Sequence, residues 1–282
     1  MAFRDLLLPL VSYPQGAPQG ALEAAVDVAA RLGGEVTSLA LRVDLPELHN
    51  AIANAVIGLD AMVRAQEAES ARVAGAQADA FAAAAAQRGV TATALSERAS
   101  LYDIGLKVAE HARTRDLVLL PLGRTIPPEA QMTETVLFGA GRPLVVFPEE
   151  LKPSGADSFQ TVAVAWDGSR AAARAVADAM PALHRAGQVR VVVAVGEKES
   201  VRAGAAQDLA RHFAAHGIKA EVDEIHAGKT PIGRILADYV QAQNVDLLVM
   251  GGYGHSRVRE HVLGGATSSM LRAPACPVLI SH

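Results

Sequence analysis

The two halves of the chain follow the same pattern, and this internal repeat restricts the chain to a duplicated fold. Residues 116–123, Asp-Leu-Val-Leu-Leu-Pro-Leu-Gly, match residues 246–253, Asp-Leu-Leu-Val-Met-Gly-Gly-Tyr. Residues 133–146 match 267–280, where a helical stretch leads through a proline-containing turn into an apolar run. A polar segment with Pro153 and Gly155 lies between the halves. We therefore expect a domain over 1–148, a linker over 149–157 and a second domain over 158–282.

Within each half, short apolar runs alternate with longer stretches of helical periodicity. This alternation predicts α/β domains with parallel sheets. In the first half it predicts strands at 6–10, 36–43, 90–95, 117–120 and 144–147, and helices at 20–32, 48–88, 103–113 and 133–138. In the second half it predicts strands at 161–166, 189–195, 220–226, 247–250 and 278–281, and helices at 169–185, 201–215, 232–243 and from 266 onward.

The most distinctive stretch begins after the apolar run 247–250. Gly251, Gly252 and Gly254 follow that run, and Gly264 and Gly265 precede the last helix. Glycine lets backbone N–H groups approach a ligand, and N–H groups at loops and helix starts bind phosphate. The stretch is not a P-loop, because no Gly-Lys-Ser/Thr follows, and it lacks the third glycine of the dinucleotide fingerprint. The alternative is a strand-to-helix turn that needs its glycines for geometry alone.

This glycine spacing resembles the nucleotide motif of the universal stress protein family, which is Gly, two residues, Gly, nine residues, Gly, then Ser or Thr. Gly251, Gly254 and Gly264 fit it, whereas Gly265 stands where Ser or Thr is usual, and Thr267 follows closely. Residues 162–169, Val-Ala-Val-Ala-Trp-Asp-Gly-Ser, resemble the first strand and turn of the family. The resemblance covers nearly the whole chain, which is similar to a tandem two-domain member.

The resemblance implies two doubly wound, Rossmann-like domains with the strand order 3-2-1-4-5 of nucleotide alpha hydrolase-like folds. Strands one and four are then neighbours, so Asp167 would lie beside Gly251, in the crevice where open parallel sheets bind ligands. Asp167 matches an acidic residue that lies against the nucleotide, and it is equally suited to cap the helix from Ser169. Val195 matches the position whose backbone meets the adenine. The implied ligand is ATP, alone or with magnesium.

The first half lacks these features. Residues 10–14, Leu-Val-Ser-Tyr-Pro, stand where the second half has Asp-Gly-Ser, and Pro121 stands where it has Gly251. Proline has no N–H to donate. We therefore expect a degenerate first domain and one nucleotide per chain, held by the second half.

Other classes of function have little support. The net charge of -4 and the sequence pI of about 6.1 give no indication of a strongly basic surface for nucleic acid. The single cysteine, Cys276, excludes an internal disulfide and is expected to be a small buried hydrophobe. His212 and His216 lie four apart, where a solvated helix face is favoured over a metal site. No secretory signal or membrane-spanning run is evident, so a cytoplasmic protein is expected.

The leading hypothesis is a cytosolic stress-response or regulatory protein that binds an adenine nucleotide and acts on an unknown protein partner. A nucleotide-free interaction module of the same fold is the alternative, and catalysis is limited to slow ATP hydrolysis or self-phosphorylation. The last strands of the two halves, 144–147 and 278–281, would be sheet edges, which proteins cover. We expect them to pair antiparallel as a pseudo-dimer within one chain, which leaves homodimer formation through other surfaces open.

Overall fold

A computed structural model describes residues 2–46, 58–123, 127–195, 204–253 and 265–282, without the side chains of 127–131. The elements of the first half are β1 Asp5–Val11, α1 Gln19–Leu32, β2 Glu35–Asp44, α3 Leu59–Arg88, β3 Ala92–Ser100, α4 Ile104–Ala112, β4 Leu117–Leu122, α5 Pro127–Gly139 and β5 Leu144–Pro148. Those of the second half are β6 Thr161–Ala165, α6 Arg170–Leu183, β7 Gln188–Val195, α7 Ala205–Ala215, β8 Ala220–His226, α8 Ile232–Ala242, β9 Leu247–Gly251, α9 Ala266–Arg272 and β10 Val278–Ser281.

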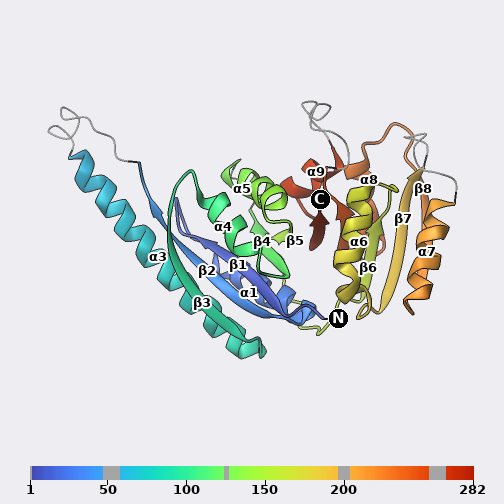
Figure 1. Cartoon of the computed structure of the whole chain (residues 1–282), viewed down its shortest axis with the longest axis horizontal. Coiled ribbons are helices and arrows are strands. Elements are labelled where there is room, and N and C mark those ends of the chain that lie inside the picture. Colours follow the sequence, from blue (N-terminus) through green and yellow to red (C-terminus); the bar gives the residue numbers. More distant parts are fainter. Residues whose placement is uncertain (1, 47–57, 124–126, 196–203, 254–264) are drawn as a thin grey trace.

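Among the described residues, ten strands form one sheet in the order β3-β2-β1-β4-β5-β10-β9-β6-β7-β8 (Figure 1). Each half thus has the predicted order 3-2-1-4-5, and its strands are parallel. The halves meet where β5 and β10 pair antiparallel, with Val145 opposite Leu279. The α/β fold, the strand order and this pairing confirm the predictions from the sequence.

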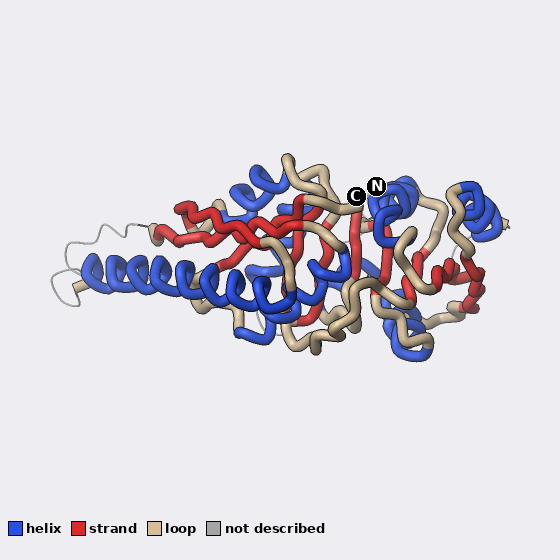
Figure 2. Tube along the Cα trace, turned by 90° about the horizontal axis from the view of Figure 1, so that it is seen from below, coloured by secondary structure: helices blue, strands red, loops and turns tan. Residues whose placement is uncertain are grey.

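Helices cover both faces of the sheet (Figures 1 and 2). Helices α1, α3, α6 and α7 contribute buried residues to one apolar cluster, which includes Phe81 in the first half and Phe213 in the second. Helices α4, α5, α8 and α9 contribute to a cluster on the opposite face. Leu6 and Leu8 of β1 belong to the first cluster and Leu7 to the second, because successive side chains of a strand point to opposite faces. Both clusters run through both halves, so the halves share a continuous core.

Local sequence explains two helix ends and one helix start. Helix α1 ends at Gly33 and α3 at Gly89, with left-handed φ values of 83° and 72° that glycine adopts without strain. Helix α6 begins after Ser169, whose hydroxyl accepts the N–H of Ala172 at 3.1 Å. Its position as N-cap matches the preference of serine for this place.

Three expected elements differ from those observed. Helix α3 begins at Leu59 after Gly58, and residues 48–57 of the expected helix lie outside the described residues. Strand β3 runs on to Ser100, because it pairs with β2 as far as Asp44 although most of its residues there are polar. Helix α5 begins at Pro127 instead of at 133, since proline fits the first turn of a helix, where no N–H partner exists.

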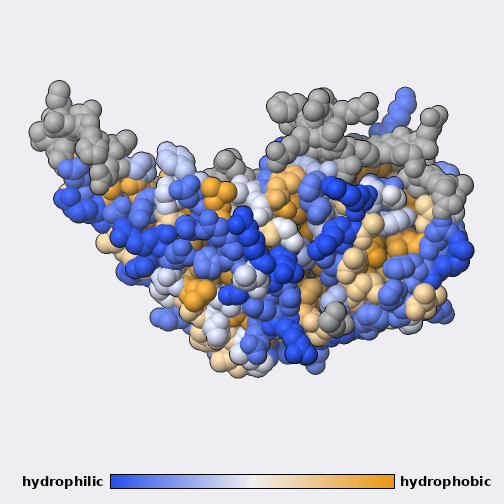
Figure 3. All heavy atoms as spheres, in the orientation of Figure 1, coloured by the Kyte–Doolittle hydropathy of each residue, from blue (hydrophilic) through white to orange (hydrophobic). Residues whose placement is uncertain are grey.

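The exposed residues of α3 mix alanines with charged and polar side chains. Figure 3 shows the face of the molecule seen in Figure 1 as largely hydrophilic, with apolar residues scattered among polar ones. Only five residues of this helix are buried, among them Ser70, Gln77 and Phe81. None of the described helices is both long and apolar enough to cross a lipid bilayer.

Candidate functional site

Strands β6 and β9 end side by side, as the sequence predicted. They pair in parallel, with Ala165 opposite Met250. Asp167 and Gly251 therefore leave the sheet at the same carboxyl edge, the edge at which open parallel sheets bind ligands.

The first turn of α6 lies directly against the end of β9. A Cβ added to Gly251 would be 2.5 Å from the backbone nitrogen of Ala172 and 2.6 Å from the carbonyl carbon of Ala171. The positive end of this 14-residue helix, with the first-turn amides that Ser169 does not cap, therefore meets the end of the strand. This contact gives a structural reason why residue 251 has no side chain, and the expected role of Gly251 in nucleotide binding stays a prediction.

Asp167 shapes the turn that leads into α6. Its Oδ1 atom accepts the N–H of Ser169 at 3.0 Å, while Ser169 itself caps the helix. Asp167 is thus not the N-cap residue but the acceptor of an Asx turn one step earlier. Among the described residues, its other carboxylate oxygen has no hydrogen-bond partner and remains able to accept from a ligand.

The hydroxyl of Thr267 is engaged by the chain itself. Its Oγ1 atom accepts the N–H of Tyr253 at 3.1 Å, and the residue is only 7% exposed. Thr267 therefore ties α9 to the residues that follow β9. Because its hydroxyl accepts this bond, its own hydrogen is still available to donate, and the expected contact with phosphate stays a prediction. Gly265 is the N-cap of α9 with an extended backbone. Gly254 and Gly264 lie outside the described residues.

Two further residues lie at this edge. Val195 is the last residue of β7, and its carbonyl accepts the N–H of Ala227 at 3.0 Å. The indole N–H of Trp166, the residue that follows β6, is buried and has no hydrogen-bond partner among the described residues. An orphaned buried donor carries a free-energy cost of about 1–3 kcal/mol unless another molecule satisfies it.

Contacts from the first half reach this edge, and the sequence analysis did not foresee them. The phenol of Tyr253 donates a hydrogen bond to Oε1 of Glu134 on α5. The ring of Tyr253 lies 5.2 Å from that of Phe138, centroid to centroid. Phe138 in turn contacts the ring of His282, whose Nδ1 lies 3.0 Å from the carbonyl oxygen of Gly252. An aromatic residue directly after a glycine-rich strand end was the only local signal for this cluster.

The matching edge of the first half is filled by side chains of α3. Gln77 donates to the carbonyl of Val11 and accepts the N–H of Ala17, at 3.2 and 2.8 Å. The hydroxyls of Ser12 and Ser70 are hydrogen bonded at 2.6 Å. A cavity of about 90 Å³ remains there, well below the roughly 300 Å³ at which small-molecule sites begin. The described residues thus leave little space for a nucleotide at this edge, and the degenerate first domain of the sequence analysis stays a prediction.

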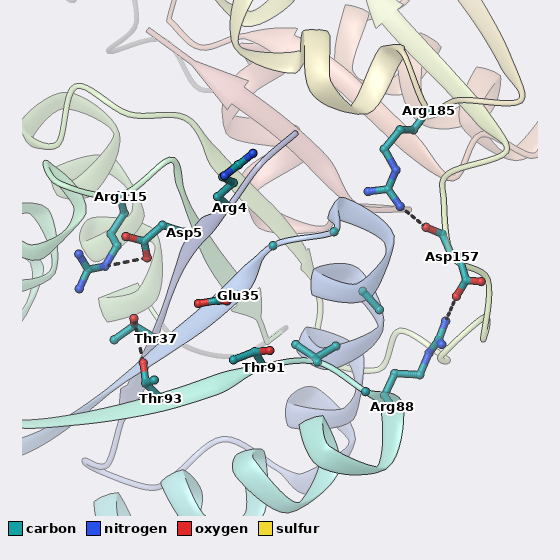
Figure 4. Close-up of a pocket in the computed structure, with 15 residues that line it drawn as sticks. Arg4, Asp5, Glu35, Thr37, Arg88, Thr91, Thr93, Arg115, Asp157 and Arg185 are labelled. Carbon is teal, nitrogen blue, oxygen red and sulfur yellow. Dashed lines mark hydrogen bonds and ion pairs between the residues drawn. The ribbon is translucent and has the colours of Figure 1, made fainter. Parts of the chain in front are cut away.

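The largest of the described cavities, about 940 Å³, lies at the opposite, amino edge of the first-half strands (Figure 4). Arg88 and Arg185 both bond to Asp157 in the linker, the former to its carboxylate and the latter to its carbonyl. Arg115 pairs with Asp5 at 3.2 Å. Because these guanidinium groups hold the protein's own segments, the cavity belongs to the joint between the halves and is not the site favoured by the sheet topology.

Titratable groups elsewhere in the described residues form no candidate metal centre. No group of three or more His, Cys, Asp or Glu side chains there is arranged to hold a metal ion. Burial raises the pKa of the Cys276 thiol to about 12, which fits a structural residue. Burial and the neighbouring Asp223 raise the pKa of Tyr239 to about 12. Burial would raise the pKa of Asp223, but hydrogen bonds from Arg190 and Tyr239 outweigh it and lower that pKa.

Comparison with known proteins supports the fold and the family. The model of the universal stress protein family matches residues 158–282. A universal stress protein of Synechocystis is 38% identical over 65 residues, which are 22% of this chain and only 21% of the relative.

Among solved structures, a universal stress protein from Archaeoglobus fulgidus superposes with a TM-score of 0.71 at 18% identity, over 99% of this chain and 97% of that one. A functionally unknown protein from Pseudomonas aeruginosa gives 0.53 at 15% identity, over 99% and 92%. At these identities the likeness shows the fold alone. The match of residues 158–282 places the second half of the chain in the universal stress protein family.

Proposed function

We propose that the second half binds an adenine nucleotide, ATP, and that the chain acts as a cytosolic stress-response regulator through the occupied state. The observation that carries this proposal is the meeting of the positive end of α6 with the end of β9, beside the Asp167 carboxylate. Helix starts attract phosphate, and this helix start lies at the edge where parallel sheets bind nucleotides.

The described residues suit different parts of such a ligand. The amides at the start of α6 suit the phosphates. The free oxygen of Asp167 suits a donor, such as a ribose hydroxyl or the adenine amino group. Val195, at the end of β7, lies on the same edge and suits the adenine, as the family resemblance implies. The orphaned indole N–H of Trp166 adds a donor whose cost a bound ligand or water would relieve.

The first half contributes no second nucleotide site to this proposal. Gln77 and Ser70 fill the matching edge, and Pro121 has no amide hydrogen there. The expected stoichiometry is one nucleotide per chain.

Calorimetric titration of the full chain with ATP and magnesium chloride tests the proposal. We expect a stoichiometry near one and an affinity reduced roughly tenfold by Asp167→Asn, which keeps the turn acceptor but replaces the free oxygen with a donor. Asp238→Asn, at a 55% exposed carboxylate on α8, is the matched control and should bind as the unaltered chain does. Two equal sites, or no effect of Asp167→Asn, would contradict the proposal.

A nucleotide-free interaction module is the second candidate. It is favoured by Gly251, whose lack of a side chain is explained by the contact with α6, and by Thr267, whose hydroxyl holds Tyr253. Mass spectrometry of small molecules released on denaturation separates the two candidates. No released nucleotide, together with no heat on titration with ATP, would establish this second candidate.

A further inference from the structure

Tyr253, the first residue after the Gly251–Gly252 pair, is held by the first half of the molecule. It has a φ of 49°, in the left-handed region that residues other than glycine seldom adopt. Such a conformation persists only where the surroundings hold it in place. The contacts of Tyr253 therefore decide the path of the chain where it leaves β9.

Helix α5 supplies these contacts from the other half, 119 residues away along the chain. Glu134 accepts the phenol hydrogen of Tyr253, and Phe138 packs against its ring. Leu137 of the same helix also lies against Gly252, where an added Cβ would be 3.0 Å from its Cδ2 atom. Three residues on one helix of the first half thus meet the two residues that follow Gly251.

The second half completes the fixation. The amide of Gly252 donates to the carbonyl of Ser281 at 2.7 Å, and that of Tyr253 donates to Thr267 at 3.1 Å. Both amides are therefore bonded within the second half, while the side chain of Tyr253 is bonded to the first. The strand end is clamped between α9 and α5.

The first half offers no matching side chain for such a clamp at the repeated position. In the repeat, the position that matches Tyr253 is Gly123, which has no side chain to extend toward the other half. The half that lacks the glycine motif thus steadies the half that carries it, and the reverse contact cannot form.

We infer that Glu134 and Phe138 are positioning residues for the nucleotide site of the second half, acting through Tyr253. This inference rests on the proposed function, because the site that they position is the one assigned above to ATP. By linkage, a ligand that favours the clamped strand end must in turn strengthen the contact between the halves.

Titration of full-length variants with ATP and magnesium chloride tests the inference. Tyr253→Phe removes the phenol hydroxyl, and Glu134→Ala removes its acceptor. We expect each substitution to weaken ATP binding roughly fivefold. Because both remove the same bond, the double variant should bind ATP about as tightly as the single variants do. Glu134→Gln, which keeps an acceptor, should restore most of the affinity lost in Glu134→Ala.

Matched controls separate positioning from general destabilisation. Tyr102→Phe alters a tyrosine that is 78% exposed, and Glu110→Ala alters a carboxylate on α4 that is 53% exposed. Neither should change the affinity. An unchanged affinity in Tyr253→Phe, or fully additive losses in the double variant, would overturn the inference.

Hydrogen exchange at the amides of Gly252 and Tyr253 gives a readout that needs no nucleotide. Both amides should exchange faster in Tyr253→Phe and Glu134→Ala than in the two controls. If the unaltered chain binds no ATP, the proposed function fails, and this measurement still decides whether α5 holds the strand end. Unchanged exchange at both amides would overturn the inference whatever the titration gives.

Discussion

The carboxyl edges of the two halves start from the same strand order and end differently. In the first half, the connection between the second and third strands contains the 30-residue helix α3, whose Ser70 and Gln77 reach the end of β1. In the second half the matching connection contains α7, of 11 residues, and the start of α6 lies against the end of β9. One long helix was therefore enough to turn a potential ligand edge into hydrophobic and hydrogen-bonded core.

The amino edges, in contrast, have stayed alike. Asp116 accepts the amides of Arg4 and Asp5 at the start of β1. Asp246 accepts the amides of Gln160 and Thr161, the matching positions at the start of β6. An aspartate before the fourth strand thus fixes the first strand in both halves, which explains why this residue opens both copies of the repeat. Asp246 also binds Arg31 of the first half at 2.7 Å.

The largest expected effect tests this shared anchor. Asp246→Ala should lower the free energy of unfolding by about 3 kcal/mol, because it leaves Arg31, which is 4% exposed, without its nearest carboxylate. Asp116→Ala, which removes the same anchor from the first half without a buried partner, should cost about 1 kcal/mol. Urea unfolding of both variants measures the difference. Equal losses would show that Arg31 does not depend on Asp246.

The next prediction concerns the strand end at the proposed site. Gly251→Ala should cost about 2 kcal/mol, since its Cβ would lie 2.5 Å from the backbone of α6. Gly75→Ala in α3 is the matched control, because a Cβ there meets nothing within 4 Å, and it should stabilise the chain by roughly 0.5–1 kcal/mol. Unfolding midpoints in urea compare the two. If Gly251→Ala is as stable as the unaltered chain but fails to bind ATP, the result would instead indicate that this glycine lets the ligand approach the backbone.

A third change tries to reopen the first edge. Gln77→Ala should cost about 1 kcal/mol, because it leaves the N–H of Ala17 and the carbonyl of Val11 without their bonds to this side chain. It should not create a second nucleotide site, since Pro121 still lacks an amide hydrogen. Calorimetric stoichiometry reads the outcome, with the exposed Gln66→Ala on the same helix as control. A stoichiometry near two would show that Gln77 alone keeps the first half from binding a nucleotide.

The smallest expected effect is a difference in acid sensitivity between the outer strands. The first half joins β2 and β3 through the hydroxyls of Thr37 and Thr93, at 3.2 Å, and through the exposed pair Arg98–Asp44. The second half joins β7 and β8 through the less exposed pair Arg190–Asp223. Because the pKa of Asp223 is lowered on folding, its stabilisation is present above the ordinary value of 3.8 and is lost as the pH falls below it.

Thermal unfolding between pH 6 and pH 3 tests this difference. The midpoint of Asp223→Asn should fall less on acidification than that of the unaltered chain. Asp238→Asn, at a 55% exposed carboxylate, should follow the unaltered chain. Parallel curves for all three proteins would remove Asp223 from the explanation.

Local sequence patterns determined the architecture of this protein. Apolar periodicity and the repeated Asp-initiated run predicted the alternating elements and the duplication, and the family resemblance supplied the strand order. Strands and helices can be predicted from the sequence because their periodicity depends on residues only a few positions apart. The contrast between Pro121 and Gly251 is equally local, since it depends on whether an amide hydrogen exists at all.

Only the tertiary structure decided how the two edges are used. No local pattern shows that Gln77 turns into the first edge, or that Gly251 has no side chain because Ala172 lies against it. The bond between Tyr253 and Glu134 joins residues 119 positions apart. Such contacts depend on how the pairing of β5 and β10 places the two halves. Local sequence preferences do not predict contacts between residues so far apart along the chain.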